Sequence, residues 1–275
     1  MVGRDVTGMV ARRHGISWLG VATAISLVLA VGIAASGRDQ QAKDQSLTEL
    51  YRFEMVQAAP GRLLELIELY KRRAPGVGAG GDEMPIITRH SQGDHWDLLA
   101  IYPMGSFTAY YSPERVAKRR AAIEASHKTT AAYAGQFYDL VAWHQEEYVN
   151  GPPIGVLRSH VQGAGLVHFE MMQALAGKRD SLIEERKMEN AFNRERGRGE
   201  TLIFVHEQGA PWDVITIGVY RNWRQYAESD GIAAEVSDAA ARKAGFANAD
   251  AVGPYMRSLI STHRDTLGPP VRLEK

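Results

Sequence analysis

The chain carries one stretch of sequence twice, and this internal repeat limits what it can fold into more than any other feature. Shifting the sequence by 116 positions aligns "HSQGDHWD", from His90 to Asp97, with "HEQGAPWD", from His206 to Asp213, without a gap. Between residues 53 and 110, 19 of 58 positions are identical to their partners in the second copy, where chance would give roughly three or four. Two copies of about 110 residues are too few and too long for a solenoid of stacked repeats. We therefore expect two copies of one folded unit that pack against each other.

Each copy shows the same succession of strand and helix patterns. In the first copy a strand-like run at 51–58 precedes a helical run at 62–73, in which apolar residues recur every three or four positions. Runs rich in β-branched and aromatic residues flank the repeated octet and predict a hairpin. A long helical stretch at 113–148 and a short final strand at 154–161, after Gly-Pro-Pro, complete the unit. The corresponding runs of the second copy are 166–174, 178–194, 223–266 and 271–273.

The order β-α-β-β-α-β is the ferredoxin-like, or split βαβ, pattern. A unit of this kind has helices on only one face of its sheet, so the other face must be covered. Two tandem units can cover each other within one chain. The sequence therefore predicts an α+β fold in which two ferredoxin-like units pair as an intrachain barrel.

The N-terminal part of the chain has a different character. Residues 16–35 are 20 consecutive uncharged residues, preceded by Arg12 and Arg13. Such a segment is typical of a secretory signal peptide, or of an uncleaved helix long enough to anchor the chain in a bilayer. Because the basic flank stays inside, we expect the rest of the chain to be periplasmic or extracellular. The predicted segments are 1–37 (signal peptide or membrane anchor), 38–47 (linker), 48–163 (first ferredoxin-like repeat) and 164–275 (second ferredoxin-like repeat).

The composition excludes several classes of function. The 275 residues include 32 basic and 32 acidic side chains, and this balance gives no electrostatic footprint for nucleic acid. The chain has no cysteine, which removes disulfides, thiolate metal sites and cysteine nucleophiles. It also has no phosphate-binding glycine loop and no Gly-x-Ser-x-Gly elbow.

Two segments of the first copy resemble a known superfamily. They are "YRFEMVQAAPGRLLELIELYKRR", an extended strand followed by a Pro-Gly helix start, and "HWDLLAIYP", a strand that begins with a tryptophan. Both are similar to segments of the dimeric α+β barrel proteins, in particular NIPSNAP-type and EthD-like members, over most of residues 48–275. The superfamily includes cofactor-free monooxygenases, haem-degrading oxygenases, haem peroxidases, chlorite-decomposing enzymes, muconolactone-type isomerases and ligand binders. The resemblance therefore implies a fold but no single activity.

Polar residues that recur in both copies are the first candidate site residues, because we expect a pocket between the paired sheets. Glu54 and Glu170 lie in the middle of apolar strands. Burial there would raise the carboxyl pKa and suit each to acid/base catalysis. His90 and His206 end the second strand of each copy and could transfer protons. The alternative is structural, with each glutamate in an ion pair and each histidine bonded to the turn.

The residues that follow the hairpin are candidate ligand-binding residues. Trp96 and Trp212 would form apolar walls of the site, next to Asp97 and Asp213. The alternative is again structural, because an aspartate at this point can cap a turn by accepting hydrogen bonds from backbone N–H groups.

A further pair of histidines is expected near the ends of the last helices. His144 and His263 are each followed two residues later by an acid, Glu146 or Asp265. The pair could ligate a metal, or one histidine could be an axial haem ligand. A histidine in the last helical turn is also explained by the helix dipole alone.

The leading hypothesis is a small-molecule-handling protein outside the cytoplasm, with a cofactor-free oxygenase-like or isomerase-like activity. In it, Glu54, Glu170, His90 and His206 supply the acid/base groups. Two alternatives stay open. One is a non-enzymatic ligand-binding or assembly module tethered to the membrane by residues 16–35, and the other is a haem-binding protein. Further oligomerisation is compatible with each.

Overall fold

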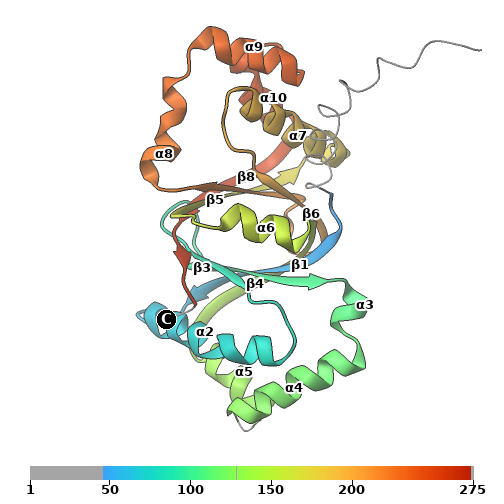
Figure 1. Cartoon of the computed structure of the whole chain (residues 1–275), viewed down its shortest axis with the longest axis vertical. Helices are drawn as coiled ribbons and strands as arrows, with labels where there is room; N and C mark the ends of the chain where they lie inside the picture. Colours follow the sequence, from blue (N-terminus) through green and yellow to red (C-terminus); the bar gives the residue numbers. More distant parts are fainter. Residues whose placement is uncertain (1–45, 128, 274–275) are drawn as a thin grey trace, which may run out of the picture. The chain divides into compact units, whose positions relative to one another are not determined.

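The computed structural model describes residues 46–127 and 129–273. They form an α+β fold whose strands pair antiparallel in one sheet, in the order β8-β5-β7-β6-β4-β1-β3-β2-β9 (Figure 1). The predicted signal or anchor segment, residues 16–35, lies outside these residues. Within them, no helix combines the length and the apolar character that crossing a membrane requires.

The elements of the first copy are β1 (Glu49–Ala58), α2 (Leu63–Ala79), β2 (Ile86–Arg89), β3 (Leu98–Gly105), α3 (Phe107–Tyr110), α4 (Pro113–His127), α5 (Thr130–Tyr138) and β4 (Val141–Gly151). After α6 (Ile154–Val161) come β5 (Leu166–Ala174), α7 (Arg179–Glu195), β6 (Leu202–Gly209), β7 (Val214–Tyr220), α8 (Trp223–Ala227), η1 (Glu228–Gly231), α9 (Ala234–Ala244), η2 (Ala249–Ala251), α10 (Val252–Arg257), β8 (Ile260–Gly268) and β9 (Pro270–Val271).

Equivalent residues of the two copies occupy equivalent places. Helix α7 begins and ends 116 residues after α2. Phe53 is paired with Ile101 between β1 and β3, and Phe169 is paired with Ile217 between β5 and β7. The sequence repeat thus corresponds to a matched helix and to matched strand registers.

The sheet closes on itself through two contacts between the copies, which we call the seams. At the first seam β4 pairs with β6, so that Val149 lies opposite His206. At the second seam the end of β8 runs beside the residues after β2. There the Ser91 N–H donates to the carbonyl of Leu267, whose own N–H donates to the carbonyl of Gln92. Strand β9 continues this contact by pairing with β2.

Apolar side chains from both copies fill the interior of this closed sheet. Phe53 and Phe169 are 0% and 1% exposed and belong to one core cluster with Trp96 and Trp212. Leu157 of α6 packs into the same cluster, and Figure 1 shows α6 in front of the strands of both copies. The expectation of a pocket between the paired sheets is therefore wrong, because large apolar side chains occupy that space.

The last strand of each copy lies earlier in the chain than expected. Helix α5 ends at Tyr138, and residues 141–151 form β4, which pairs with β1 along its length, whereas a helix was predicted up to residue 148. The cross-strand contacts of β4 outweigh its helical pattern. In the second copy β8 likewise replaces the end of a predicted helix. The run at 154–161, predicted as a strand, is helix α6, which begins after Pro153, a residue suited to a helix start.

Candidate functional site

Strand alternation directs Glu54 away from the packed interior. Phe53 and Met55 point inward, so Glu54 faces helix α2 on the other side of β1. Its carboxylate accepts hydrogen bonds from the hydroxyls of Tyr70 (3.2 Å) and Tyr102 (3.1 Å), and the residue is 7% exposed. Burial and the charge of Glu54 hold the pKa of both phenols well above the usual value. Both tyrosines therefore stay protonated and act as donors.

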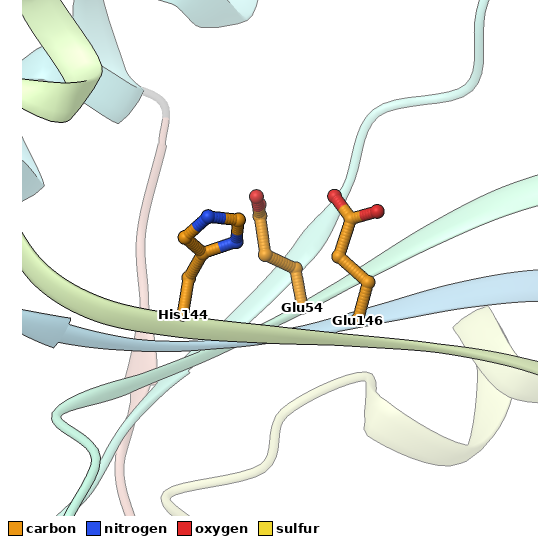
Figure 2. Close-up of side chains that lie close together, drawn as sticks. All are labelled: Glu54, His144 and Glu146. Carbon is orange, nitrogen blue, oxygen red and sulfur yellow. The ribbon is translucent and has the colours of Figure 1, made fainter. Parts of the chain in front are cut away.

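His144 and Glu146 of β4 stand beside Glu54 (Figure 2). In the β1–β4 register Glu54 lies opposite Glu146, and residues two apart share one face of a strand. One donor atom from each of the three residues lies within 4.8 Å of the others. Arg52 Nη1 donates to Glu146 Oε1 at 2.6 Å, which leaves the second oxygen of Glu146 for another partner.

These residues line a cavity of about 320 Å³, which we call the first cavity. Residues of the outer face of β1, β3 and β4 and of helices α2, α4 and α5 form its wall. Arg73 is the unusual member of this wall. Its guanidinium lies 3.7 Å from the ring centre of Tyr133, and its Nε is buried without a hydrogen-bond partner. Within residues 46–127 and 129–273, no carboxylate forms an ion pair with Arg73.

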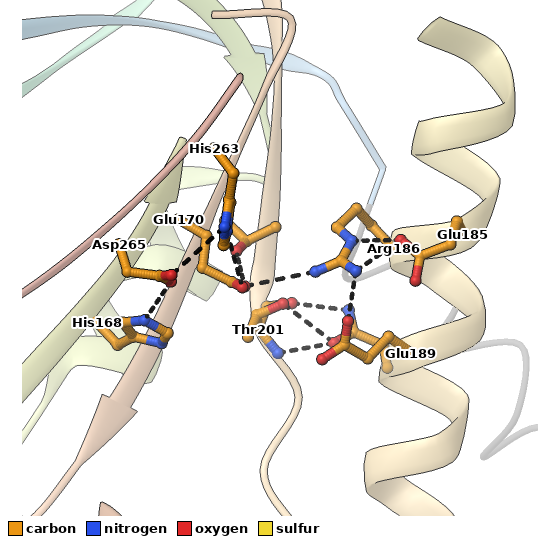
Figure 3. A network of polar contacts seen from close by, with 10 residues as sticks. His168, Glu170, Glu185, Arg186, Glu189, Thr201, His263 and Asp265 are labelled. Atoms are coloured by element: carbon orange, nitrogen blue, oxygen red, sulfur yellow. Dashed lines mark hydrogen bonds and ion pairs between the residues drawn. The ribbon is translucent and has the colours of Figure 1, made fainter. Parts of the chain in front are cut away.

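The second copy holds an equivalent trio with different surroundings (Figure 3). Glu170 of β5 lies opposite Asp265 of β8, and His263 precedes that acid by two residues. His263 Nε2 is 3.6 Å from Glu170 Oε1, and His263 Nδ1 is 3.4 Å from Asp265 Oδ2. A cavity of about 620 Å³, the second cavity, has Glu170 in its wall. Both copies thus combine two carboxylates and an imidazole on the outer face of the sheet.

A buried guanidinium replaces a phenol in the second copy. Arg186 of α7 occupies the position equivalent to Tyr70, 116 residues later. It forms ion pairs with Glu185 (2.6 Å) and Glu189 (2.5 Å) and lies 3.5 Å from Glu170. Burial raises the pKa of Glu185 to about 7. The helix thus brings a charged network to the trio where the first copy has a neutral donor.

Two opposing effects set the ionisation of Glu170. Burial alone raises the pKa of its carboxyl, but His263 and the charges of Arg186 and His168 outweigh burial and hold this pKa at about 2. Thr216 also donates to Glu170 Oε2 at 2.8 Å. Glu170 is therefore an ionised carboxylate throughout the physiological pH range.

His90 and His206 lie at the seams and not in the wall of either cavity. His90 Nδ1 is 2.8 Å from Thr266 Oγ1, and His206 Nδ1 is 3.0 Å from Glu147 Oε1. Thr266 and Glu147 each follow the acid of a trio by one residue, so they belong to the opposite face of the strand. The structure thus gives both histidines a contact that joins the copies. Their role in proton transfer stays a prediction.

Trp96 and Trp212 belong to the packed interior, with 1% and 8% exposure. Asp97 Oδ2 accepts a hydrogen bond from the last N–H of β1 (2.8 Å), and Asp213 Oδ2 does the same for β5 (2.9 Å). None of the four lines either cavity. Their contact with a ligand stays a prediction, while the turn cap weighed as the alternative matches the hydrogen bonds of both aspartates.

His144 and His263 lie on strands β4 and β8, which corrects their expected place at helix ends. On these strands His144 lies next to Glu54 and His263 next to Glu170, the two glutamates predicted as acid/base groups. The sequence reasoning missed the helix residues around them. One signal was present, because Tyr110 recurs as Tyr226, and each lines the cavity of its own copy. The other missed wall residues are Arg52, Tyr70, Arg73 and Tyr102 in the first cavity and Glu189 in the second. Arg186, also missed, lies beside Glu170.

The closed sheet with helices on its outer faces is the arrangement called a dimeric α+β barrel. An anthrone oxidase-like protein of known structure superposes with a TM-score of 0.53 at 13% sequence identity, over 82% of this chain and 92% of that chain. A candidate monooxygenase from Lactobacillus acidophilus NCFM (TM-score 0.48, 9% identity, 82% of this chain and 95% of that chain) is also similar. So is a candidate chlorite dismutase (TM-score 0.44, 12% identity, 82% and 96%). At these identities the likeness concerns the fold alone.

No protein family matches the chain in sequence. No curated protein matches it either. The predicted kinship with NIPSNAP-type and EthD-like proteins therefore stays a prediction.

Proposed function

We propose that the chain is an enzyme that moves protons on a small, planar, anionic substrate bound in the first cavity. The observation that carries this proposal is the trio of Glu54, His144 and Glu146, which stands in the cavity wall together with the unpaired cation of Arg73. The deprotonated substrate is the common first product of isomerase-like and of cofactor-free oxygenase-like chemistry.

His144 is the base in this proposal. Its side chain is exposed, and an imidazole can accept a proton from a substrate bound beside it. Glu54 lies beside it with a carboxylate that two phenols keep in place through Oε2. When His144 takes a proton from the substrate, the neighbouring negative charge stabilises the imidazolium.

Arg73 is the substrate-binding group. The half-buried guanidinium donates to the backbone carbonyl of Tyr133 but has no carboxylate partner among the described residues. Burial lowers its pKa, although the charge of Glu54 acts in the opposite direction. A carboxylate or phenolate of the substrate would supply the missing charge-assisted hydrogen bonds. The aromatic rings of Tyr110 and Tyr133 in the same wall suit a planar ligand.

Haem binding through His144 or His263 is the alternative, and the surroundings of these two residues favour it less. An axial histidine of a haem faces an apolar slot wide enough for the macrocycle. His144 instead stands beside Glu54, with Glu146 on the far side of that glutamate (Figure 2), and His263 contacts both Glu170 and Asp265. Burying carboxylates against an apolar ring would be costly.

We further propose that the chain is a tandem duplication of one ferredoxin-like unit that works outside the cytoplasm. The matched registers at a spacing of 116 residues support the duplication. The uncharged segment at 16–35 behind two arginines supports export. A reporter enzyme that is active only outside the cytoplasm, fused to the C-terminus, tests the location. An inactive reporter in cells that contain the intact fusion would contradict it.

Proton transfer can be tested before the natural substrate is known. Full-length protein is incubated in D₂O with a panel of small phenols, aromatic carboxylates and 2-oxo acids, and C–H exchange is followed by proton NMR. We expect exchange of at least one compound class. His144→Gln should slow it by roughly 10² to 10⁴-fold, as loss of a general base does.

Two further variants sharpen this test. Arg73→Met should weaken binding of the exchanging anion, while His95→Gln, which changes an exposed histidine outside the first cavity, is the matched control. If wild-type protein binds none of the compounds and catalyses no C–H exchange, the enzyme proposal is wrong. That result would favour the alternative of a non-enzymatic assembly module. Exchange that persists in His144→Gln would remove His144 from the role of base.

A further inference from the structure

A buried imidazole nitrogen in the second copy lacks a partner. The His263 side chain is only 10% exposed, and its Nε2 makes no hydrogen bond with the residues that the structure describes. The nearest carboxylate oxygen, Glu170 Oε1, is 3.6 Å away, which is too far for a hydrogen bond. Such orphaned atoms are rare and call for an explanation.

Each of the two neighbouring carboxylates keeps one oxygen close to the His263 ring. Thr216 occupies Glu170 Oε2, and His168 Nε2 lies 3.0 Å from Asp265 Oδ1. The remaining oxygens, Glu170 Oε1 and Asp265 Oδ2, are the ones that approach His263. Ligand atoms of the three residues lie within 4.8 Å of one another, so a small inward movement suffices to place all three around one ion.

The charge around this point is unbalanced. Besides Glu170 and Asp265, the network includes Glu185 and Glu189, and both of these pair with the single guanidinium of Arg186 (Figure 3). The four acidic side chains thus share the guanidinium of Arg186 and the imidazole of His168. A further positive charge next to Glu170 and Asp265 would offset the repulsion between them.

We propose that the second copy binds a divalent first-row transition-metal ion through Glu170, His263 and Asp265. One imidazole and two carboxylates are ligands that Zn²⁺ accepts, and three protein ligands leave a position for water or a ligand. His168, bonded to Asp265, orients that carboxylate, as residues behind metal ligands commonly do. This site is separate from the first cavity, so it does not depend on the proposed proton transfer.

The equivalent trio of the first copy lacks the feature that carries this inference. His144 is exposed, so its nitrogens can bond to water. Glu146 is paired with Arg52 at 2.6 Å, a guanidinium whose position holds a histidine, His168, in the second copy. The two histidines therefore form a matched pair for an experiment.

The test uses full-length protein without an affinity tag, freed of metal by a chelator. Zn²⁺ is titrated by calorimetry, and Co²⁺ is added separately to record the ligand-field absorption of the bound ion. We expect one ion per chain. His263→Gln should abolish the Co²⁺ spectrum, and His144→Gln should leave both the stoichiometry and the spectrum unchanged.

A second variant guards against a simple loss of folding. His168→Asn keeps the trio and changes only the residue behind Asp265, so it should weaken Zn²⁺ binding by about 10 to 100-fold while the Co²⁺ spectrum persists. Circular dichroism confirms that each variant is folded. The proposal is overturned if wild-type protein binds no ion, if folded His263→Gln binds as wild type does, or if His144→Gln is the variant that loses the ion.

Discussion

At the scale of single residues, the most unusual group outside the two cavities is Glu147. It is 0% exposed at the first seam, where its Oε1 meets His206 and its Oε2 has no partner within the described ranges. Burial and the nearby Asp213 raise the pKa of its carboxyl to about 9. Glu147 is therefore protonated at neutral pH in the folded chain and ionised in the unfolded chain.

This difference predicts a pH-dependent stability. Between pH 6 and pH 9 folding binds a proton at Glu147, so the free energy of unfolding should fall as pH rises, by up to about 4 kcal/mol for a full proton. Glu147→Gln, which stays neutral, should flatten this part of the profile. Urea unfolding at pH 6 and pH 9 measures both, and an unchanged slope in the variant would exclude Glu147 as its source.

At the scale of elements, the repeated octet builds the two turns that touch the opposite copy. Gly93 and Gly209 have φ angles of +113° and +110°. An added Cβ would lie 1.9 Å from the carbonyl oxygen of Asp265 at the first and 2.6 Å from that of Glu146 at the second. Each turn thus packs closely against the backbone of the strand that carries the trio of the other copy, β8 or β4.

Alanine at these turns should destabilise the chain in a set order. Gly93→Ala adds a clash to backbone strain and should cost about 3 kcal/mol or more, with a smaller loss for Gly209→Ala. Gly61→Ala is the matched control, because φ is +77° there and no atom lies within 4 Å of the added Cβ. It should cost only about 1 kcal/mol. Equal losses for Gly61 and Gly93 in chemical denaturation would show that the close approach does not matter.

The elements also show how far the sequence could predict this structure. The first strand of each copy and helix α7 were predicted to within about two residues, because their apolar periodicity is strong and local. Helix α2 was predicted to end at residue 73 but continues through Pro75 and two glycines to Ala79. Strand β4 was not predicted, because it forms by pairing with β1 and β6, which lie far away along the chain. The same holds for the site. Glu54 and Glu170 stood out as charges in apolar strands, whereas Tyr70 and Arg186 are ordinary helix residues until the fold brings them to the sheet.

At the scale of the whole described region, one interior serves both copies. Phe53 of the first copy and Phe169 of the second belong to the same core cluster, and Phe53 lies 5.0 Å from the ring of Phe204 across the seam. Each copy has apolar clusters of its own beneath its helices, but this inner cluster is built by both copies together. The two should therefore unfold together and not as separate domains.

Calorimetry checks this cooperativity. Wild-type protein should show one heat-absorption peak with equal calorimetric and van't Hoff enthalpies. Phe53→Ala and Phe169→Ala should each shift that single peak to lower temperature, since removing a buried phenylalanine costs about 3–5 kcal/mol. Two peaks, of which each variant moves only one, would mean that the copies fold independently.

The seams have a consequence for how the two sites can change. In a symmetric pair of identical chains, every substitution appears in both sites at once, so neither can alter its chemistry alone. Here equivalent positions such as 70 and 186 are separate codons of one gene, while the shared interior keeps the halves together. A tyrosine can face one trio and an arginine the other without any loss of pairing. Two sites on one chain can thus differ in charge, as the residues at positions 70 and 186 do.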